Sequence, residues 1–555
     1  MKTRSLKTAI ACLVFYLAAS FPAWADTGPK FEVSFSAAAH AGPITGRVFV
    51  IVSKSDASEP RLQVGSWRGQ TPFFGADVDL LKPGQAAVID AGTLGYPAAS
   101  LKEIPAGEYF VQALLNAYTR FPRSDGHVIW AHMDQWEGQQ FNRSPGNLYS
   151  ETKKVRLDPA AGYKIRLALT KVIPPIEVPA DTEWVKRVKF ESRLLSAFWG
   201  QPIYLGATVV LPKGYDSHPD VRYPVVYEQG HFGLGAPFGF RNQPAANEHR
   251  GDDTGLYQAW ISEDFPRLIL VTFQHPTPYY DDSYAVDSAN NGPYGQAIMT
   301  ELIPYLEEHF RILRQPNARL LTGGSTGGWE SLALQVYHPG FFGGTWTLFP
   351  DPVDFRRYQL VDIYSDANAF QAPGVQWMIP ERPMMRSVEG QVTQTVRQMS
   401  RLEEVLGSKG RSGQQFEAWE AAYGPVGDDG YPKPLWDKRT GKVDSETATY
   451  MRDHGYDLRH YLESRWKEIG PRLVGKLHFY CGDMDNYYLN VSLDMLEGFL
   501  KKTTDPYYDG SFEWGRPMKG HGWSPLAPPE LLKVMAEHVL RNDPEAAAPA
   551  PWHYR

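Results

Sequence analysis

The stretch Arg319-Leu-Leu-Thr-Gly-Gly-Ser-Thr-Gly327 decides the fold class of this chain. Its first four residues resemble a strand, and residues 329–337 carry a helical pattern that Pro339 ends. Between them the pattern G-x-S-x-G places small residues on both sides of Ser325, as a very sharp strand-to-helix turn requires on steric grounds. The stretch therefore predicts a turn that lifts the Ser325 hydroxyl clear of a sheet.

Around this turn, strand-like runs alternate with helical patterns over residues 185–543. The runs are 205–211, 225–227, 268–273, 320–322, 345–349 and 477–481. One helix between them is clear, because Ile298, Leu302, Tyr305 and Leu306 share a face. Such alternation predicts an α/β fold with a doubly wound, mostly parallel sheet that helices cover on both sides.

Residues 351–470 interrupt this rhythm. One predicted helix places Val392, Val396, Met399, Leu402 and Val405 on one face and ends at Gly407, and a second carries Leu458, Leu462, Trp466 and Ile469. An insertion between the sixth and seventh strands lies where it can cover the carboxyl ends of the sheet. We therefore expect a helical cap over the site.

The region before this fold has a different pattern. Residues 26–171 alternate apolar and polar side chains in short runs separated by Gly, Pro, Asp and Ser, which predicts a small all-β, sandwich-like domain. Residues 172–184 contain several prolines and predict a stiff linker. At the other end, residues 544–555 are expected to form a loose tail.

The first 25 residues have the features of a signal peptide. A basic start is followed by an apolar stretch, residues 8–20, which is too short for a comfortable membrane span. Ala23-Trp-Ala25 then offers the small residues that a signal peptidase reads. We expect a mature chain that begins near Asp26, is periplasmic or secreted, and has no membrane insertion after cleavage.

Charge and cysteine content exclude several classes of binding partner. The 555 residues carry a formal net charge of −7 and no basic block, which argues against nucleic acid. Of the two cysteines, Cys12 lies in the signal peptide, so Cys481 has no internal disulfide partner and a cysteine-built zinc site is excluded. The acidic pairs at 252–253 and 281–282 are interpreted as solvated, and no metal is assigned. The oligomeric state stays open.

A serine hydroxyl becomes a nucleophile only when a base takes its proton. In folds built around this turn, the acid and then the histidine follow the serine along the chain. The run 476–481 resembles a strand that ends beside Asp483 and Asp485. Asp485 is preferred as the acid, with Asp483 as the alternative; the other would then be a turn or cap residue.

The histidine follows from position. After Asp485 the sequence holds His521, His538 and His553, of which His538 lies in a helical pattern and His553 in the tail. His521 lies in the loop Lys519-Gly-His-Gly-Trp523 just before the last helix. His521 is therefore the predicted base.

Two backbone N–H groups are needed to stabilise the oxyanion of an acyl-transfer intermediate. One is predicted at Thr326, directly after the nucleophile. The second is expected from the loop Glu228-Gln-Gly-His-Phe-Gly233, at His231 or Phe232. His231 could alternatively contact substrate through its side chain.

The loop 279–294 is dense in polar and aromatic residues and follows the fourth strand, so it should line the rim of the site. Tyr284, Asn290 and Tyr294 are the predicted substrate contacts within it. The alternative is an ordered loop whose polar groups bond to one another.

The segments Leu211-Pro-Lys-Gly-Tyr215, Tyr223-Pro-Val-Val-Tyr227, Gly323-Gly-Ser-Thr-Gly327 and Gly520-His521 together resemble the putative esterase family, which includes enterochelin esterases, S-formylglutathione hydrolase-like enzymes and feruloyl esterase modules. The resemblance covers about residues 185–540. It implies an α/β-hydrolase fold, ester hydrolysis through an acyl-serine, and no cofactor. It also implies Ser325 as nucleophile, His521 as base and Asp485 as acid.

These features predict an exported serine esterase with a small-molecule or oligomeric ester as substrate. A serine peptidase is the first alternative, although the region before residue 172 is too short and too free of repeats for the propeller of such enzymes. An acyltransferase with the same catalytic residues is the second.

Overall fold

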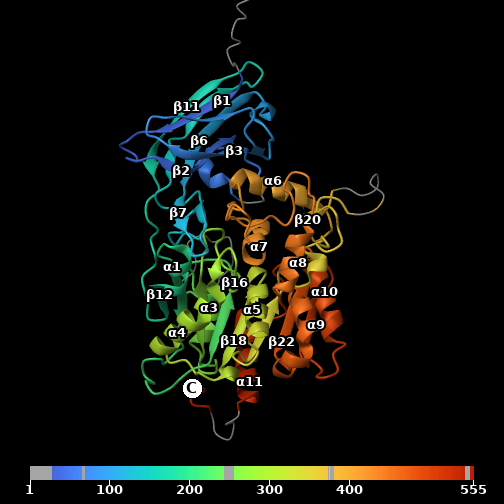
Figure 1. Ribbon diagram of the computed structural model, residues 1–555. Coiled ribbons are helices and arrows are strands. Elements are labelled where there is room, and N and C mark those ends of the chain that lie inside the picture. Colours follow the sequence, from blue (N-terminus) through green and yellow to red (C-terminus); the bar gives the residue numbers. More distant parts are fainter. Residues whose placement is uncertain are drawn as a thin grey trace, which may run out of the picture.

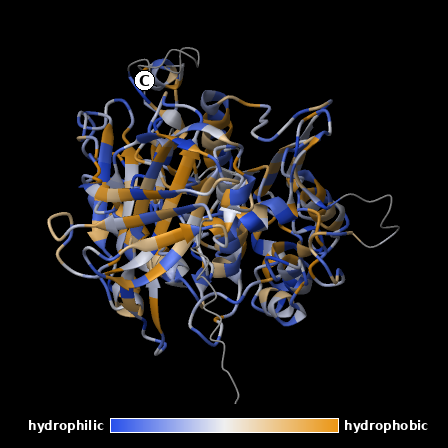
Figure 2. Cartoon of the chain, turned by 90° about the horizontal axis from the view of Figure 1, so that it is seen from above, coloured by the Kyte–Doolittle hydropathy of each residue, from blue (hydrophilic) through white to orange (hydrophobic). Residues whose placement is uncertain are grey.

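The computed structural model describes residues 28–65, 69–242, 255–372, 374, 381–543 and 550–554. The predicted signal peptide lies outside the described residues. Figure 1 shows an N-terminal group of strands at one end of the molecule and a layered arrangement of helices and strands below it. Hydrophobic residues are prominent on the strands of the interior (Figure 2).

The N-terminal region is built of strands. They are β1 (Lys30–Phe35), β2 (Ile44–Ser53), β3 (Phe73–Leu81), β4 (Ala87–Asp90), β5 (Gly95–Tyr96), β6 (Gly107–Ala117), β7 (Thr119–Pro122), β8 (Val128–Ala131), β9 (Leu148–Ser150), β10 (Lys153–Leu157) and β11 (Lys164–Val172). Nine of them pair into one sheet of order β4-β1-β11-β9-β6-β2-β3-β5, with β10 on β6, while β7 and β8 form a separate hairpin. In β1 the apolar residues Phe31, Val33 and Phe35 are buried and their neighbours are not, as period-two alternation predicts.

The second sheet is the one that the sequence predicts as mostly parallel. Its strands are β12 (Val185–Glu191), β13 (Tyr204–Val210), β14 (Val225–Gln229), β15 (Ile269–Gln274), β18 (Arg319–Gly324), β19 (Gly344–Leu348), β22 (Leu477–Gly482) and β23 (Ser511–Gly515). Their order is β12-β13-β15-β14-β18-β19-β22-β23, and all pairs from β15 to β23 are parallel. The six predicted strands are confirmed, and the two edge strands β12 and β23 are additional.

Helices cover this sheet, so the fold is α/β. They include α1 (Arg193–Trp199), α2 (Gly255–Trp260), α5 (Thr326–Tyr337), α10 (Leu489–Leu500) and α11 (Pro528–Arg541). The helix predicted around residue 300 is confirmed as α3 (Tyr294–Ala297), a π-helical segment (Ile298–Leu302) and α4 (Ile303–His309). Its predicted inner face is buried at Ile298, Leu302 and Leu306.

Residues 351–470 lie between β19 and β22, and their regular structure is mainly helical. They hold the hairpin β20 (Pro383–Arg386) and β21 (Val392–Thr395), followed by α6 (Val396–Leu406), α7 (Gln415–Tyr423), α8 (Ser445–Asp453) and α9 (Leu458–Ile469). The predicted helix begins at Val396, where the Thr395 hydroxyl accepts from the Gln398 N–H. Val392 is not on that helix, because the chain there pairs in the hairpin and leaves this side chain half exposed.

The insertion packs against the N-terminal strands, and Figure 1 shows α6 beside β3. Buried Arg47 of β2 donates from Nε to Val405 O and from Nη2 to Glu404 O, both at 2.9 Å. From the insertion, Arg411 donates to Asp77 on β3 at 3.1 Å. Because these guanidinium groups satisfy backbone carbonyls and a carboxylate across the contact, they fix the insertion against the first sheet.

Segments outside the two sheets complete the chain. Of the predicted linker 172–184, Val172 is the last residue of β11, and residues 173–184 contain no helix or strand. Of the predicted tail 544–555, residues 544–549 and 555 lie outside the described residues. The described part is packed on the fold, because Trp552 is buried, and Tyr554 stacks on His218 at 3.8 Å and donates to Lys213 O. Within the described ranges, none of the helices has the length and apolar character needed to cross a membrane.

Candidate active site

The backbone at Ser325 has the geometry of a strained turn. Strand β18 ends at Gly324, α5 begins at Thr326, and Ser325 between them has φ 59° and ψ −120°. A Cβ added to Gly323 would lie 2.3 Å from the carbonyl oxygen of Gly327, and a Cβ added to Gly327 would lie 2.0 Å from the carbonyl oxygen of Gln229. Glycine is therefore the residue that fits on both sides, and the strain concentrates on the serine, as is common where function demands it.

Ser325 is surrounded by backbone from the neighbouring strand. Its N–H donates to Leu348 O at 3.1 Å, and its carbonyl accepts from the Asp351 N–H at 3.1 Å. Its hydroxyl donates to Asp351 Oδ1 at 3.4 Å. The next residue, Thr326, is the first of α5, so the helix supplies no partner for its N–H.

The two carboxylates at the end of β22 have different partners. Asp485 is fully buried, and its Oδ2 lies 2.7 Å from His521 Nδ1. Its other oxygen accepts from the Tyr487 N–H at 2.8 Å, which fixes the orientation of the carboxylate. Asp483 instead accepts from the Lys519 N–H at 2.9 Å. Of the predicted pair, the structure therefore brings Asp485 to the histidine.

His521 is held by its neighbours on several sides. Its ring packs edge-on against Phe349 and Tyr487, each with centroids 4.7 Å apart. Its backbone N–H donates to Asn486 Oδ1 at 2.9 Å. With Nδ1 directed at Asp485, Nε2 is the ring nitrogen that remains for another partner. The hydroxyl of Ser325 bonds to Asp351 rather than to this nitrogen.

Ser325 and His521 line one cavity of about 200 Å³. Its lining residues are His231, Ser325, Asp351, Gln359, Met384, Gln415, Trp419, Tyr487, Leu489 and His521. They come from the carboxyl edge of the second sheet and from the insertion, which contributes Asp351, Gln359, Met384, Gln415 and Trp419. The predicted serine and histidine thus share a small pocket, and half of its lining residues belong to residues 351–470.

Asp351 is a pocket residue that the sequence reasoning missed. It is 3% exposed, and its Oδ2 accepts from Tyr284 Oη at 2.7 Å and from Thr326 Oγ1 at 3.0 Å. The same oxygen also accepts from Gln415 Nε2 at 3.2 Å and from Trp419 Nε1 at 3.4 Å. Burial raises the pKa of Asp351, although the hydrogen bond from Tyr284 opposes this. Its place directly after a strand of the parallel sheet was the available signal, because catalytic groups gather at that edge.

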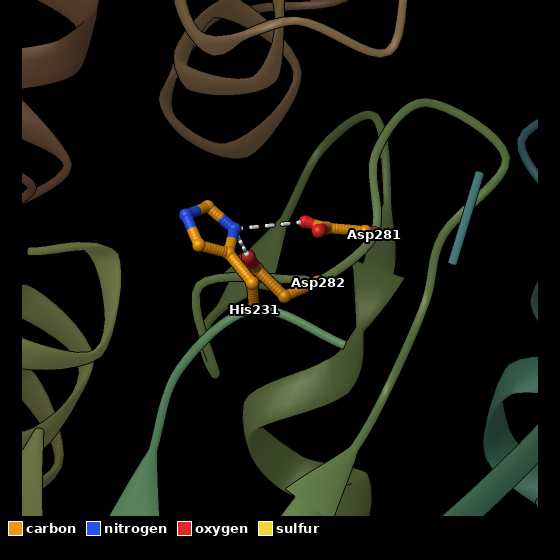
Figure 3. Close-up of side chains that lie close together, drawn as sticks. All are labelled: His231, Asp281 and Asp282. Atoms are coloured by element: carbon orange, nitrogen blue, oxygen red, sulfur yellow. Dashed lines mark hydrogen bonds and ion pairs between the residues drawn. The ribbon is translucent and has the colours of Figure 1, made fainter. Parts of the chain in front are cut away.

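His231 lies on the loop after β14 and faces two aspartates (Figure 3). Its Nδ1 is 3.2 Å from Asp281 Oδ1 and 3.6 Å from Asp282 Oδ2. Desolvation opposes the charged ring, but the two negative charges outweigh it and raise the pKa of His231 well above 6.5. The structure thus pairs the side chain of His231 with acids and also exposes it to the pocket.

The same three residues have the side chains of a possible metal site. Their ligand atoms lie within 4.8 Å of one another, which suits a cation. A hydrogen bond from His231 Nδ1 to Asp281 requires a proton on that nitrogen, whereas a metal would need its lone pair. The ion pair accounts for the geometry of the cluster.

The predicted rim residues are placed differently from one another. Tyr284 is buried and does not line the pocket itself, but its hydroxyl donates a hydrogen bond to Asp351, which does. Asn290 and Tyr294 are fully buried and do not line the pocket: Asn290 Nδ2 donates to Gly424 O at 2.8 Å, and Tyr294 Oη donates to Pro276 O at 2.6 Å. Both donors are used within the fold, but their partners lie outside the loop 279–294.

A second hollow of about 410 Å³ adjoins the pocket. The two share His231 and Gln415, and the hollow is lined by residues 138–143, 412–415, Leu62, Val64, Gly65, Tyr280 and Asp281. Phe232, predicted as an oxyanion donor through its backbone, directs its ring away to Trp136, with centroids 5.3 Å apart. The approach to Ser325 is therefore bordered by both the N-terminal region and the insertion.

Comparisons with known proteins address the family of the chain. The family model described as "Putative esterase" matches residues 204–352, which include the turn at Ser325. A comparison with curated proteins found no match. Similar solved structures include an S-formylglutathione hydrolase from Agrobacterium tumefaciens, at 14% identity and a TM-score of 0.33 over 65% of this chain and 98% of that one.

Two feruloyl esterases are similar at the same level. A ferulic acid esterase from Anaeromyces mucronatus shows 14% identity and a TM-score of 0.28, over 64% of this chain and 91% of that one. The feruloyl esterase module from Clostridium thermocellum shows 12% identity and a TM-score of 0.28, over 65% of this chain and 89% of that one. The resemblance to the putative esterase family that the sequence predicts is supported over residues 204–352, the part of the chain that matches the family model, and this match indicates a carboxylic-ester hydrolase.

Proposed function

We propose that this protein is an exported serine esterase that hydrolyses carboxylic esters through an acyl-serine intermediate. In this proposal Ser325 is the nucleophile, His521 the base and Asp485 the acid. The observation that carries it is the 2.7 Å contact between His521 Nδ1 and Asp485 Oδ2 in the pocket that contains Ser325. That contact fixes the tautomer of the imidazole and leaves Nε2 to accept a proton.

Acylation begins when the Ser325 hydroxyl turns from Asp351 toward His521. Oγ attacks the ester carbonyl while its proton passes to His521 Nε2, and the negative charge of Asp485 stabilises the imidazolium that forms. The tetrahedral intermediate then collapses, and the carbon–oxygen bond to the alcohol breaks. The departing alcohol takes the proton from Nε2, which leaves the acyl group on Ser325.

The oxyanion of this intermediate needs donors that are in place before the reaction. The N–H of Thr326 is the first donor in the proposal, since it follows the nucleophile and heads α5, where the helix dipole also favours negative charge. The second is the backbone N–H of His231 or Phe232, on the loop after β14. Deacylation repeats the steps with water, whose proton goes to His521 and then to Ser325 as the acid product leaves.

The remaining parts of the chain have proposed roles around this chemistry. Residues 26–171 form the all-β domain and residues 351–470 the helical cap, which narrows the pocket through Gln415 and Trp419. Residues 1–25 direct export and are then removed. Mass spectrometry of the secreted or periplasmic protein is expected to find an N-terminus near Asp26.

The test of the reaction is labelling with a fluorophosphonate probe, which modifies an activated serine. The wild-type protein is expected to react at Ser325, and Ser325→Ala is expected to lose both labelling and hydrolysis of short esters, with a rate lower by about 10⁴-fold or more. Circular dichroism of both proteins controls for folding. Full ester hydrolysis by a folded Ser325→Ala variant would refute the proposal.

A further inference from the structure

Asp351 is a buried carboxylate at the reaction centre whose two oxygens have unequal partners. Oδ2 accepts from four side chains, those of Tyr284, Thr326, Gln415 and Trp419. Oδ1 faces the pocket and receives a single hydrogen bond, the 3.4 Å contact from Ser325 Oγ. The fold thus holds the group firmly by one oxygen and presents the other to whatever occupies the pocket.

Catalysis would take away that one partner. If Ser325 turns to His521, as the proposed function requires, Oδ1 loses its hydrogen bond while the carboxylate stays 97% buried. An unpaired buried carboxylate oxygen is costly, so a donor must replace the hydroxyl. With substrate filling the pocket, the group that can take this place belongs to the substrate.

The charges around the pocket indicate what kind of donor fits. Among its described lining residues Asp351 is the one acid, none is Lys or Arg, and the two histidines are His231 and His521. His231 is already paired with Asp281 and Asp282, and His521 with Asp485. The charge of His231 offsets part of the Asp351 charge, but no cation among the described lining residues forms a hydrogen bond to Oδ1. The carboxylate also repels the negative charge that develops on the ester oxygen. A positive charge on the substrate would offset both effects.

We propose that Asp351 is a specificity-determining residue that selects esters carrying a protonated amine within a few bonds of the scissile carbonyl. This inference rests on the proposed function, since it assumes that Ser325 is the nucleophile. The ammonium group donates to Asp351 Oδ1 in place of the serine hydroxyl. The amine can belong to the acyl part or to the alcohol part of the ester, and the two sources are separated by the choice of test substrates.

An alternative role for Asp351 would be purely positional. Through Gln415 and Trp419 it ties α7 to the nucleophile turn, and that role alone uses Oδ2. Removing a positional group would slow all substrates alike. A change in the ratio between charged and neutral substrates separates recognition from positioning.

The experiment compares two pairs of esters of equal shape. Phenyl glycinate and phenyl propionate place the charge on the acyl side; 2-(dimethylamino)ethyl acetate and 3-methylbutyl acetate place it on the alcohol side. Each kcat/KM is divided by the rate constant for hydroxide-catalysed hydrolysis, because an ammonium group activates a nearby ester. We expect wild-type enzyme to prefer the charged member of at least one pair by about 10- to 100-fold.

The variant Asp351→Asn keeps the shape of the side chain and an oxygen for the Oδ2 donors but removes the charge. We expect it to lower the preference to below about threefold, mainly by raising KM for the charged ester. Asp483→Asn, which removes a carboxylate outside the pocket lining, is expected to keep the wild-type ratio.

Each outcome bears on one claim. A wild-type ratio near one in both pairs, or an Asp351→Asn ratio equal to that of wild type, overturns the role of Asp351, and the first of these does not depend on the variant folding. If Ser325 also fails to react with a fluorophosphonate, the proposed function falls with it. If labelling succeeds, the esterase proposal stands and the inference about Asp351 alone is rejected.

Discussion

The Nδ1 atom of His521 lies 2.7 Å from Oδ2 of Asp485, across the end of strand β22. Asp483, two residues earlier in the same turn, accepts from the Lys519 backbone N–H instead. We expect Asp485→Asn to lower kcat for a short ester by about 10⁴-fold, because the amide no longer fixes the tautomer or stabilises the imidazolium. Asp483→Asn is the matched control and should change kcat by less than about threefold. Steady-state kinetics with both variants decides between the two carboxylates, and a reversed pattern would exchange their roles.

The contact of the insertion with the N-terminal strands predicts a difference between two arginines. Arg47→Ala removes a buried guanidinium that satisfies Val405 O and Glu404 O, so it should lower the free energy of unfolding by about 3 kcal/mol. Arg439→Ala removes an exposed ion pair to Glu404 and should cost less than about 1 kcal/mol. Thermal unfolding of both variants measures the difference. Equal small losses would show that the N-terminal strands do not support the insertion.

The buried charge of Asp351, which is proposed to select the substrate, is also expected to lower the stability of the fold near neutral pH. Because burial raises its pKa in the folded protein, the folded state binds a proton more tightly than the unfolded state. Below the unfolded pKa of about 4 both states are protonated and no penalty arises. As pH rises through the raised folded pKa, the buried charge destabilises the fold, and the nearby His231 and His521 offset only part of this.

The variant Asp351→Asn escapes this penalty. Its apparent melting temperature should match that of wild type near pH 4 and exceed it by about 1 to 3 °C near pH 7. Scanning calorimetry at several pH values measures the difference. A melting temperature that falls below wild type at pH 7 would mean that the charge-assisted hydrogen bonds outweigh the burial.

The cluster of His231, Asp281 and Asp282 predicts insensitivity to chelators. Since the hydrogen bond to Asp281 places a proton on Nδ1 of His231, hydrolysis should stay within about twofold after dialysis against EDTA. The same assay after adding back calcium, zinc or manganese serves as the control. Loss of activity on chelation with recovery by one of these ions would establish a metal site in this place.

The sequence was most informative where local chemistry constrains the backbone. The glycines at 323 and 327 predict the turn because a side chain at either position would collide with backbone. The six strands of the second sheet were visible as apolar runs, and chain order selected His521 and Asp485, which the fold brings into contact.

The sequence was least informative where tertiary packing decides. Helix α7 has all nine of its residues buried, so it lacks the one-sided apolar stripe by which helices are recognised. Asp351 could not be distinguished from other acidic loop residues without knowing that α7 packs over it. Asn290 and Tyr294 have the polar groups of substrate contacts, but their side-chain donors bind the backbone carbonyls of Gly424 and Pro276, which lie outside the loop.

Besides His231, Tyr280 and Asp281, the hollow beside the pocket is bordered by three segments from separate parts of the chain, near residues 62–65, 138–143 and 412–415. None of these segments belongs to the second sheet, whose strands precede Ser325 and Asp485. Mutational libraries confined to residues 62–65, 138–143 and 412–414, which leave Gln415 and its hydrogen bond to Asp351 intact, are therefore expected to change which molecules reach the serine with little effect on the reaction of a bound ester. For enzyme engineering, this separates the tuning of substrate range from the maintenance of the catalyst.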